Sequence, residues 1–110
     1  MKWIPLSSEE QIQEIKANSL QKPQVIFKHS TRCAISSMAR NRLDSHDPKV
    51  SVDFYFLDIL SNRQLSGKIA HDFGIRHESP QILLIKNGIC TYHESHSGIQ
   101  MEEILEQAGL

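Results

Sequence analysis

The chain has 110 residues, of which 39% are hydrophobic and 23% are charged. That length fits one compact domain, and no apolar run approaches the roughly 20 residues that a membrane-spanning helix needs. The net charge of −1 gives no electrostatic reason to expect nucleic-acid binding, and two cysteines are too few for a scaffold of several disulfides. We therefore expect residues 1–110 to form one domain of a cytoplasmic protein whose two thiols are reduced at rest.

Apolar residues recur with the periods of strands and helices in alternation, which predicts nine elements. In chain order these are an edge strand at 3–4 that Pro5 ends, a helix from 7 to about 19, a strand at 25–27, a helix from 33 that stops before Asp47, a strand at 52–57, a helix at 61–73, strands at 82–85 and 89–93, and a helix at 97–108.

Two serines are placed to begin helices. Ser7 and Glu10 have the spacing of a capping box, in which two unpaired backbone donors are satisfied reciprocally, and Ser61 and Gln64 repeat that spacing. Gly74 stands just past the third predicted helix, where glycine commonly ends a helix. The apolar residues at helical spacing are Ile12 and Ile15 in the first helix, Ile35, Met38, Ala39 and Leu43 in the second, Leu65, Ile69 and Phe73 in the third, and Met101, Ile104 and Leu105 in the last.

The predicted order is β-α-β-α-β-α-β-β-α, with a hairpin turn at Asn87-Gly88 between the last two strands. Parallel strands joined by helices and closed by an antiparallel hairpin resemble the order of the thioredoxin fold, an α/β fold with a central mixed sheet flanked by helices. Periodicity alone does not distinguish that fold from other α/β folds. The position of Cys33 does.

Cys33 lies where a strand has just ended and a helix begins. Unpaired backbone donors of the first helical turn and the helix dipole favour a thiolate there, and Arg32 adds a full positive charge. We expect the pKa of the thiol to lie below its free value of about 8.5. Lys28 and His29 at the strand end are further candidates to shift it. The alternative is that Cys33 is a small packing residue with no chemistry.

Ser36 stands three residues after Cys33, on the same face of the predicted helix. In a dithiol oxidoreductase a second cysteine at that position resolves the mixed disulfide. A hydroxyl hydrogen-bonds to the sulfur but cannot displace it, so a thiol from outside must complete the exchange. Cys33-Ala34-Ile35-Ser36 is thus a monothiol version of the Cys-x-x-Cys motif.

Ser79-Pro80 is the second informative feature, because Pro80 stands two residues before the strand at 82–85. Thioredoxin-like proteins place a cis-proline there, opposite the active cysteine, and the backbone of the residue before it pairs with the bound partner. The alternative is an ordinary proline at a strand entry.

Together these segments carry a family resemblance. KHSTRCAISSMA and RHESPQILLI resemble the monothiol bacilliredoxins, the bacillithiol-system redox-active proteins of the thioredoxin-like superfamily. The family's pattern is Ser-Thr-x-Cys-Pro-Ile-Ser around the nucleophile and His-Glu-Ser-Pro-Gln before the hairpin. Here these motifs stand as Ser30-Thr31-Arg32-Cys33-Ala34-Ile35-Ser36 and His77-Glu78-Ser79-Pro80-Gln81. Element order and length also match over essentially the whole chain.

The resemblance implies a thiol-disulfide oxidoreductase that acts on mixed disulfides between proteins and bacillithiol. Cys33 would be the nucleophile, helped by Arg32 and Ser36, and a second bacillithiol or another redoxin would reset it. It implies no bound cofactor, bacillithiol as co-substrate, and bacillithiolated proteins as partners, with neither nucleic acid nor membrane. The residues expected to contact substrate are Thr31, Ala34, Ile35, His77, Glu78, Ser79 and Pro80. His77 and Glu78 could instead only shape their loop.

Ala34 departs from the family pattern, which has proline at this position. Proline at the first helical position is pre-organised and has no donor to lose. Alanine frees one more backbone N–H near the sulfur, so we expect a tuned redox potential and a retained activity.

Cys90 and the histidines are the remaining candidates. Cys90 lies in the last strand, and as a resolving cysteine it would need its Cα within about 7 Å of that of Cys33; we expect a packing role instead. His93 and His96 are the only tight histidine pair, no cluster has zinc spacing, and we expect no metal site. A cysteine protease would need His29 or another base beside Cys33, and no such triad is marked.

Two further functions stay open at this level. One is a binding module that holds iron or an iron–sulfur cluster between two subunits through Cys33 and an external thiol, although the Cys-Gly-Phe-Ser motif of such proteins is absent. The other is a redox-inert adaptor, whose Cys33 thiol would titrate near 8.5 or higher.

Overall fold

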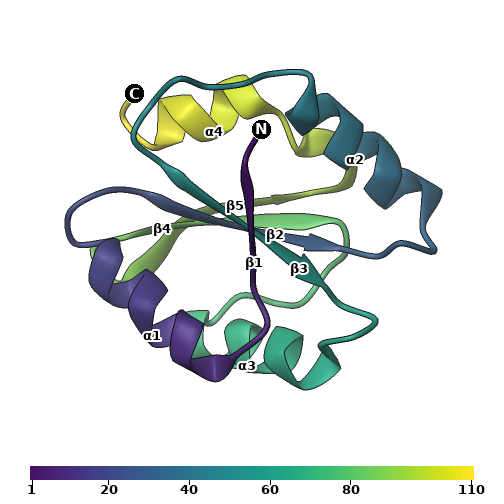
Figure 1. The fold of residues 1–110 in the computed structure, drawn as a ribbon, viewed down its shortest axis with the longest axis horizontal. Helices are drawn as coiled ribbons and strands as arrows, with labels where there is room; N and C mark the ends of the chain where they lie inside the picture. Colours follow the sequence, from purple (N-terminus) through teal and green to yellow (C-terminus); the bar gives the residue numbers. More distant parts are fainter.

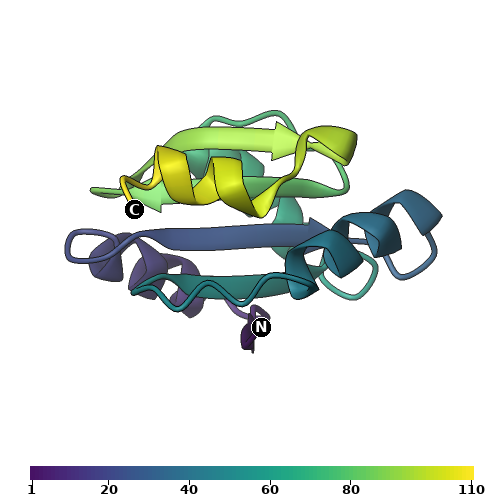
Figure 2. The ribbon, with the colours of Figure 1, turned by 90° about the horizontal axis from the view of Figure 1, so that it is seen from above.

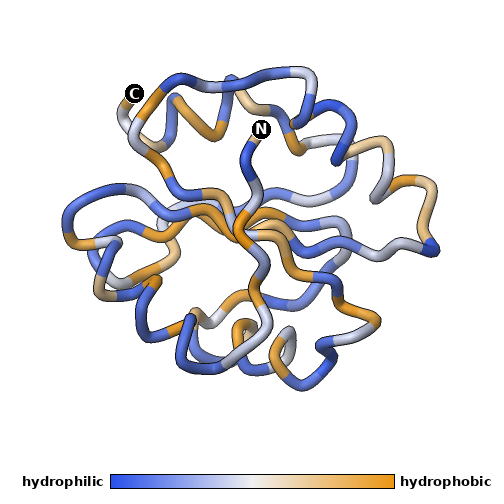
Figure 3. The backbone as a smooth tube through the Cα atoms, in the orientation of Figure 1, coloured by the Kyte–Doolittle hydropathy of each residue, from blue (hydrophilic) through white to orange (hydrophobic).

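Five short runs of apolar and aromatic residues pair into one mixed sheet in the computed structural model, which describes residues 1–110 (Figure 1). The strands are β1 (Trp3–Pro5), β2 (Gln24–His29), β3 (Asp53–Asp58), β4 (Gln81–Lys86) and β5 (Ile89–Ser95), in the spatial order β1-β3-β2-β4-β5. The first three strands are parallel, whereas β4 runs antiparallel to both β2 and β5. The central strands are therefore covered on both faces, which explains their nearly continuous hydrophobic runs (Figure 3).

Two helices cover each face of this sheet. The helices are α1 (Glu9–Asn18), α2 (Ala34–Asp44), α3 (Arg63–Phe73) and α4 (Met101–Gln107), and a short 3₁₀ turn, η1 (His96–Gly98), precedes the last. Figure 1 shows α1 and α3 below the sheet and α2 and α4 above it, and Figure 2 shows the second pair across one face. Each layer has its own core: Val25 and Phe27 pack toward α2 and α4, and Ile26 toward α1 and α3. None of the helices is both long and apolar enough to cross a bilayer.

The predicted order of elements is confirmed, but the predicted first residues of three helices are wrong. The first helix is capped by Ser8, not Ser7, and Gln11 takes the place predicted for Glu10. The Gln11 amide oxygen accepts from the backbone N–H of Ser7 at 2.8 Å and of Ser8 at 3.1 Å, while its nitrogen donates to the Pro5 carbonyl at 2.8 Å. Only an amide supplies both the acceptor and the donor, and a glutamate carboxylate does not.

The third and last helices also begin later than predicted. Asn62, and not Ser61, occupies the N-cap position of α3, and the Ser61 hydroxyl instead donates to the Asp58 carboxylate at 2.7 Å. The predicted helix at 97–108 is divided into η1 and α4, since Ile99 and Gln100 between them are extended. Gly74 ends α3 with φ 66°, as predicted, and Asn87-Gly88 forms the predicted hairpin turn with both φ values positive.

One side of α2 differs from the predicted face. Its buried stripe is Ser36, Ala39 and Leu43, each with no exposed surface. Ile35 and Met38 are exposed by 51% and 60%, although their spacing resembles that of core residues. At 3.6 residues per turn they lie about a quarter turn away from the stripe, so α2 presents two apolar side chains to solvent directly after Cys33.

The register places the sequence motifs at one end of the sheet. The carboxyl ends of β2 and β3 lie side by side, since His29 is opposite Asp58. On the other side of β2, Lys28 pairs with Gln81, the first residue of β4. The starts of α2, α3 and β4 therefore meet at the same end, at the right in Figure 1.

Candidate functional site

Cys33 occupies the N-cap position of α2, immediately before Ala34. Its backbone is extended, with φ −110° and ψ 118°, and its carbonyl accepts the N–H of Ser37 at 3.1 Å, the first bond of the helix. The N–H of Cys33 itself bonds to the Ser30 carbonyl at 3.1 Å, which closes the turn from β2. The thiol is half-buried and unpaired with any other cysteine. The helix start thus holds a free thiol partly open to solvent.

Three groups of the first helical turn lower the pKa of the Cys33 thiol from its ordinary value. The backbone N–H of Ser36 has the largest effect, followed by the Ser36 hydroxyl, and the N–H of Ile35 adds to them, while desolvation opposes them in part. These donors stabilise the thiolate, because each hydrogen bond is stronger to the charged form of the sulfur. Arg32 is exposed and is not among the groups that shift this pKa.

Ser36 is fixed by its surroundings. Its side chain is fully buried, and its oxygen accepts the backbone N–H of Ser30 at 3.4 Å. Accepting this bond leaves the hydroxyl proton free, and the proton is donated to the sulfur of Cys33, where it helps to lower the pKa of the thiol. The residue that replaces a resolving cysteine is therefore a built-in donor to the thiolate.

Replacing Ser36 by alanine is expected to raise the Cys33 pKa toward its ordinary value, because the mutation removes the hydroxyl and leaves only the backbone donors. The sign follows directly, since a higher pKa means less thiolate at pH 7 and a several-fold slower reaction with iodoacetamide. The rate measured against pH should show a midpoint that moves upward in Ser36→Ala. Ser37→Ala is the matched control, because Ser37 is exposed and is not among the groups that shift this pKa. Equal midpoints in the two variants would contradict the role of Ser36.

Facing this turn across the sheet end is the segment that leads into β4. The Ser79-Pro80 peptide bond is cis, and Pro80 is buried directly before β4. The buried Gln81 side chain holds the segment, because its amide donates to the Arg76 carbonyl at 3.0 Å and accepts the Glu78 N–H at 3.4 Å. The Ser79 hydroxyl is buried without a hydrogen-bond partner.

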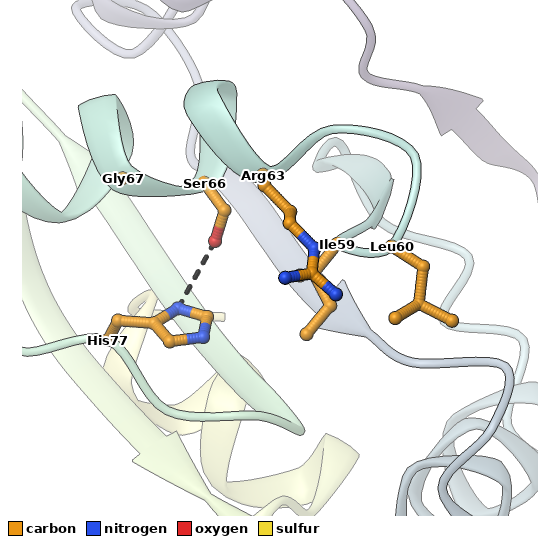
Figure 4. A pocket seen from close by; sticks show the side chains of 6 residues that line it. All are labelled: Ile59, Leu60, Arg63, Ser66, Gly67 and His77. Atoms are coloured by element: carbon orange, nitrogen blue, oxygen red, sulfur yellow. Dashed lines mark hydrogen bonds between the residues drawn. The ribbon is translucent and has the colours of Figure 1, made fainter.

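Lys28, at the end of β2, holds the same segment in place. Lys28 has no exposed surface, and its Nζ donates to the Ser66 carbonyl at 3.2 Å and lies 3.1 Å from Nδ1 of His77. Burial lowers the pKa of this lysine from 10.5 to about 8. The Ser66 hydroxyl also lies 3.1 Å from Nδ1 of His77 (Figure 4). These contacts tie β2, α3 and the loop before Pro80 together.

His29, by contrast, forms no side-chain hydrogen bond. It is nearly fully buried, both ring nitrogens lack hydrogen bonds, and the ring packs on Phe27 and Phe56. Burial is the main cause of its lowered pKa, with a further lowering by Arg40 and an opposing effect of Asp58. No hydrogen bond joins His29 to Cys33, so the structure has no cysteine–histidine pair of the protease kind.

Cys90 lies at the opposite end of the sheet from Cys33. It pairs with Ile85, which in turn stands opposite Gln24 at the start of β2, while Cys33 follows the other end of β2. The run from Gln24 to His29 spans about 16 Å at roughly 3.3 Å per residue, well beyond the reach of a disulfide. Burial raises the pKa of Cys90, and its thiol donates to the Tyr92 carbonyl at 3.4 Å. Cys90 therefore packs against the hydrophobic core and is too far from Cys33 to take part in disulfide exchange with it.

The structure collects most of the candidate residues at this sheet end. Thr31, Arg32, Ala34 and Ile35 are exposed around Cys33, and His77 and Glu78 are exposed on the facing loop. Nowhere in residues 1–110 do three or more histidine, cysteine or acidic side chains gather as metal ligands would. Sequence reasoning missed Ser66, which lies in no motif and whose hydroxyl meets Nδ1 of His77 from α3. The sequence does contain a signal for the role of Lys28, because a lysine directly after the hydrophobic run of β2 is unusual and indicates a buried polar contact.

Several solved structures that are similar to this chain have the thioredoxin fold. A solved structure of a proposed oxidoreductase with a thioredoxin fold is 31% identical, with a TM-score of 0.82 over 97% of this chain and 93% of that one. Thioredoxin from Malassezia sympodialis is 23% identical, with a TM-score of 0.75 over 97% and 91% of the two chains. Thioredoxin from Trypanosoma brucei brucei is 14% identical, with a TM-score of 0.76 over 96% and 87%. The predicted thioredoxin-like fold is confirmed.

The family match is more specific than the fold. Residues 4–104 match the family described as monothiol bacilliredoxin BrxC, a span that contains both the turn at Cys33 and the segment before β4. The thioredoxin-fold neighbours and the family together identify the general class as redox proteins of the oxidoreductase kind. This chain belongs to the monothiol bacilliredoxin family.

Proposed function

We propose that the protein removes bacillithiol from protein mixed disulfides, with Cys33 as the nucleophile. The observation that carries this proposal is the half-buried thiol at the start of α2, whose pKa is lowered by Ser36 and Ile35. A lowered pKa increases the thiolate fraction at neutral pH, and the thiolate is the reactive form. The family match supports the choice of bacillithiol as the small thiol.

The reaction is a balanced thiol-disulfide exchange. The Cys33 thiolate attacks the bacillithiol sulfur of the mixed disulfide, the bond to the protein sulfur breaks, and the substrate protein leaves as a thiolate that takes up a proton. Cys33 is left in a disulfide with bacillithiol. Since Ser36 cannot displace that disulfide, a second bacillithiol or another redoxin must release it. No bound cofactor takes part, and bacillithiol is a co-substrate.

The surroundings of Cys33 suit the two halves of such a disulfide. The exposed side chains of Ile35 and Met38 offer apolar surface to a substrate protein next to the sulfur. Arg32, Thr31 and Ala34 line the turn itself, and the loop of His77, Glu78, Ser79 and Pro80 would contact the disulfide from the facing side. We place this chemistry in the cytoplasm, where free thiols are kept reduced.

The test uses a protein with a single cysteine that carries bacillithiol. After incubation with the reduced protein, intact mass should show the bacillithiol adduct on the enzyme and its loss from the substrate, with the peptide containing Cys33 carrying the added mass. The same substrate carrying glutathione measures the preference between small thiols. A substrate that keeps its bacillithiol, with no adduct at Cys33, would contradict the proposed function.

A further inference from the structure

A cavity of about 380 Å³ opens beside the loop before Pro80, between α3 and the end of β3. Its walls are formed by Ile59, Leu60, Arg63, Ser66, Gly67 and His77, as Figure 4 shows. Volumes of this order hold small molecules. The cavity lies at the sheet end where Cys33 also lies, because Ile59 follows β3 directly and its N–H bonds to the His29 carbonyl at 3.0 Å.

The contact with Lys28 decides which nitrogen of His77 carries the proton. A lysine ammonium has only donors, so Nδ1 of His77, 3.1 Å from the Lys28 Nζ, must act as acceptor. The imidazole is then neutral, with its hydrogen on Nε2. Burial and the nearby Lys28 both lower the His77 pKa, which keeps the ring in this form, while Glu78 acts in the opposite direction. The free Nε2–H is therefore a donor to the cavity.

Arg63 supplies a second set of donors. It is exposed at the start of α3, makes no ion pair or hydrogen bond with another residue, and lines the same cavity as His77, as Figure 4 shows. A guanidinium presents a planar fork of N–H groups that matches a carboxylate. The Lys28 ammonium adds positive potential from behind His77.

No acidic side chain competes for these donors within the cavity wall. The closest carboxylate along β3, that of Asp58, is engaged by the Leu60 N–H at 3.1 Å and the Ser61 hydroxyl at 2.7 Å. Glu78 is exposed beside His77 but does not line the cavity. Ile59 and Leu60 leave an apolar part of the wall for carbon atoms.

We propose that this cavity is a carboxylate subsite, in which Arg63 and Nε2–H of His77 bind an acidic group on the small-thiol half of the mixed disulfide. The inference rests on the proposed function of Cys33 for its role in catalysis, but the anion site itself does not depend on it. Binding there would orient the small thiol so that its sulfur, and not the sulfur of the substrate protein, meets Cys33. The subsite would thereby decide which of the two sulfurs is attacked.

The binding test uses the reduced full-length protein and no disulfide. Succinate is titrated while the backbone amide resonances of Gly67 and His77 are followed by NMR, with uncharged succinamide as the control ligand. We expect saturable shifts with succinate alone, and an affinity about tenfold weaker in Arg63→Gln, in line with the loss of a charge-assisted pair. Lys49→Gln changes the net charge equally from an exposed loop and should keep the original affinity.

A second variant separates loss of the subsite from loss of the fold. A Cβ atom added at Gly67 meets no heavy atom within 4 Å, and Gly67 lines the cavity, so Gly67→Leu should place its side chain in the open space of the cavity and abolish the succinate shifts. The proposal is overturned if succinamide produces the same shifts, if Arg63→Gln and Lys49→Gln weaken binding equally, or if Gly67→Leu binds succinate as before.

A kinetic test distinguishes the subsite from the proposed function. The rates at which Cys33 attacks 3,3′-dithiodipropionate, which carries carboxylates, and neutral 2-hydroxyethyl disulfide are compared, and their ratio should fall about tenfold in Arg63→Gln. An unchanged ratio, with both disulfides reacting, would overturn the subsite and leave the oxidoreductase intact. Saturable succinate binding, with neither disulfide reacting, would overturn the proposed function and leave the subsite.

Discussion

Replacing Cys33 by serine is expected to lower the rate of bacillithiol removal by at least about a thousandfold, since a hydroxyl does not ionise at neutral pH and cannot form the mixed disulfide. Cys33 is half-buried at the surface end of α2, so the change leaves no large cavity and the variant should fold. The measurement is the rate at which a bacillithiolated test protein regains its free thiol. No bacillithiol adduct should form on the variant.

Cys90→Ser is the matched control for this variant. Cys90 lies at the far end of the sheet, and burial raises its pKa. A raised pKa means less thiolate, so we expect the control to retain the original rate and to form the same adduct as the unmodified chain. An equal loss of rate in both variants would show that the exchange uses two cysteines and would contradict the monothiol mechanism.

The second large effect concerns stability and pH at Lys28. In the fold its pKa is about 8, against an ordinary value of 10.5 that the unfolded chain regains. Between these values the unfolded chain binds more protons than the folded chain, so the free energy of unfolding must rise as the pH increases from 8 to 10.5. Below pH 8 the lysine is protonated in both states, and its contribution no longer changes with pH.

The size of this rise follows from the two pKa values. Their difference corresponds to about 3 kcal/mol, and we expect about 2 kcal/mol, because solvent reaches the His77 end of the contact and screens the charge. Urea unfolding of the reduced protein at pH 8 and pH 10.5 measures the rise. Burial raises the pKa values of Tyr55, Tyr92 and Cys90, whose titration works in the opposite direction over the same range.

The comparison with Lys28→Met removes that background. Methionine has a similar length and no charge, so the variant should lack the part of the rise that belongs to Lys28, while the tyrosine and cysteine contributions remain in both proteins. Lys49→Met, at an exposed loop position, should keep the original pH dependence. If Lys28→Met shows the same change between pH 8 and 10.5 as the unmodified chain, the lysine does not titrate between these values.

Local sequence signals were sufficient for the order of elements. Hydrophobic periodicity, the helix end at Gly74 and the turn at Asn87-Gly88 act within a few residues, and the structure confirms each of them. They were insufficient for the helix starts. The cap of α1 depends on a glutamine that reaches back to Pro5, and the cap of α3 depends on Asp58 at the end of a strand.

The exposed face of α2 illustrates a different limit. Ile35 and Met38 have the composition and spacing of core residues, and only the direction from which the sheet approaches the helix decides that Ser36, Ala39 and Leu43 are buried instead. Sequence periodicity predicts that one side of a helix is buried. When apolar side chains are spread around the helix, a small rotation about its axis changes which of them are on the buried side.

The environment that lowers the pKa of Cys33 could be predicted largely from the sequence alone, because a thiol at a helix start and the serine three residues later interact within one helical turn. Tertiary structure decided the rest. Lys28 and His77 are 49 positions apart, and only the pairing of β2 with β4 brings them to 3.1 Å. The pairing of β4 with β2 and β5 separates Cys90 from Cys33, and the packing of the His77 loop against α3 forms the cavity at the end where Cys33 lies. Local hydrogen bonds follow from neighbours in the chain, whereas contacts between strands and loops follow from the register of the sheet.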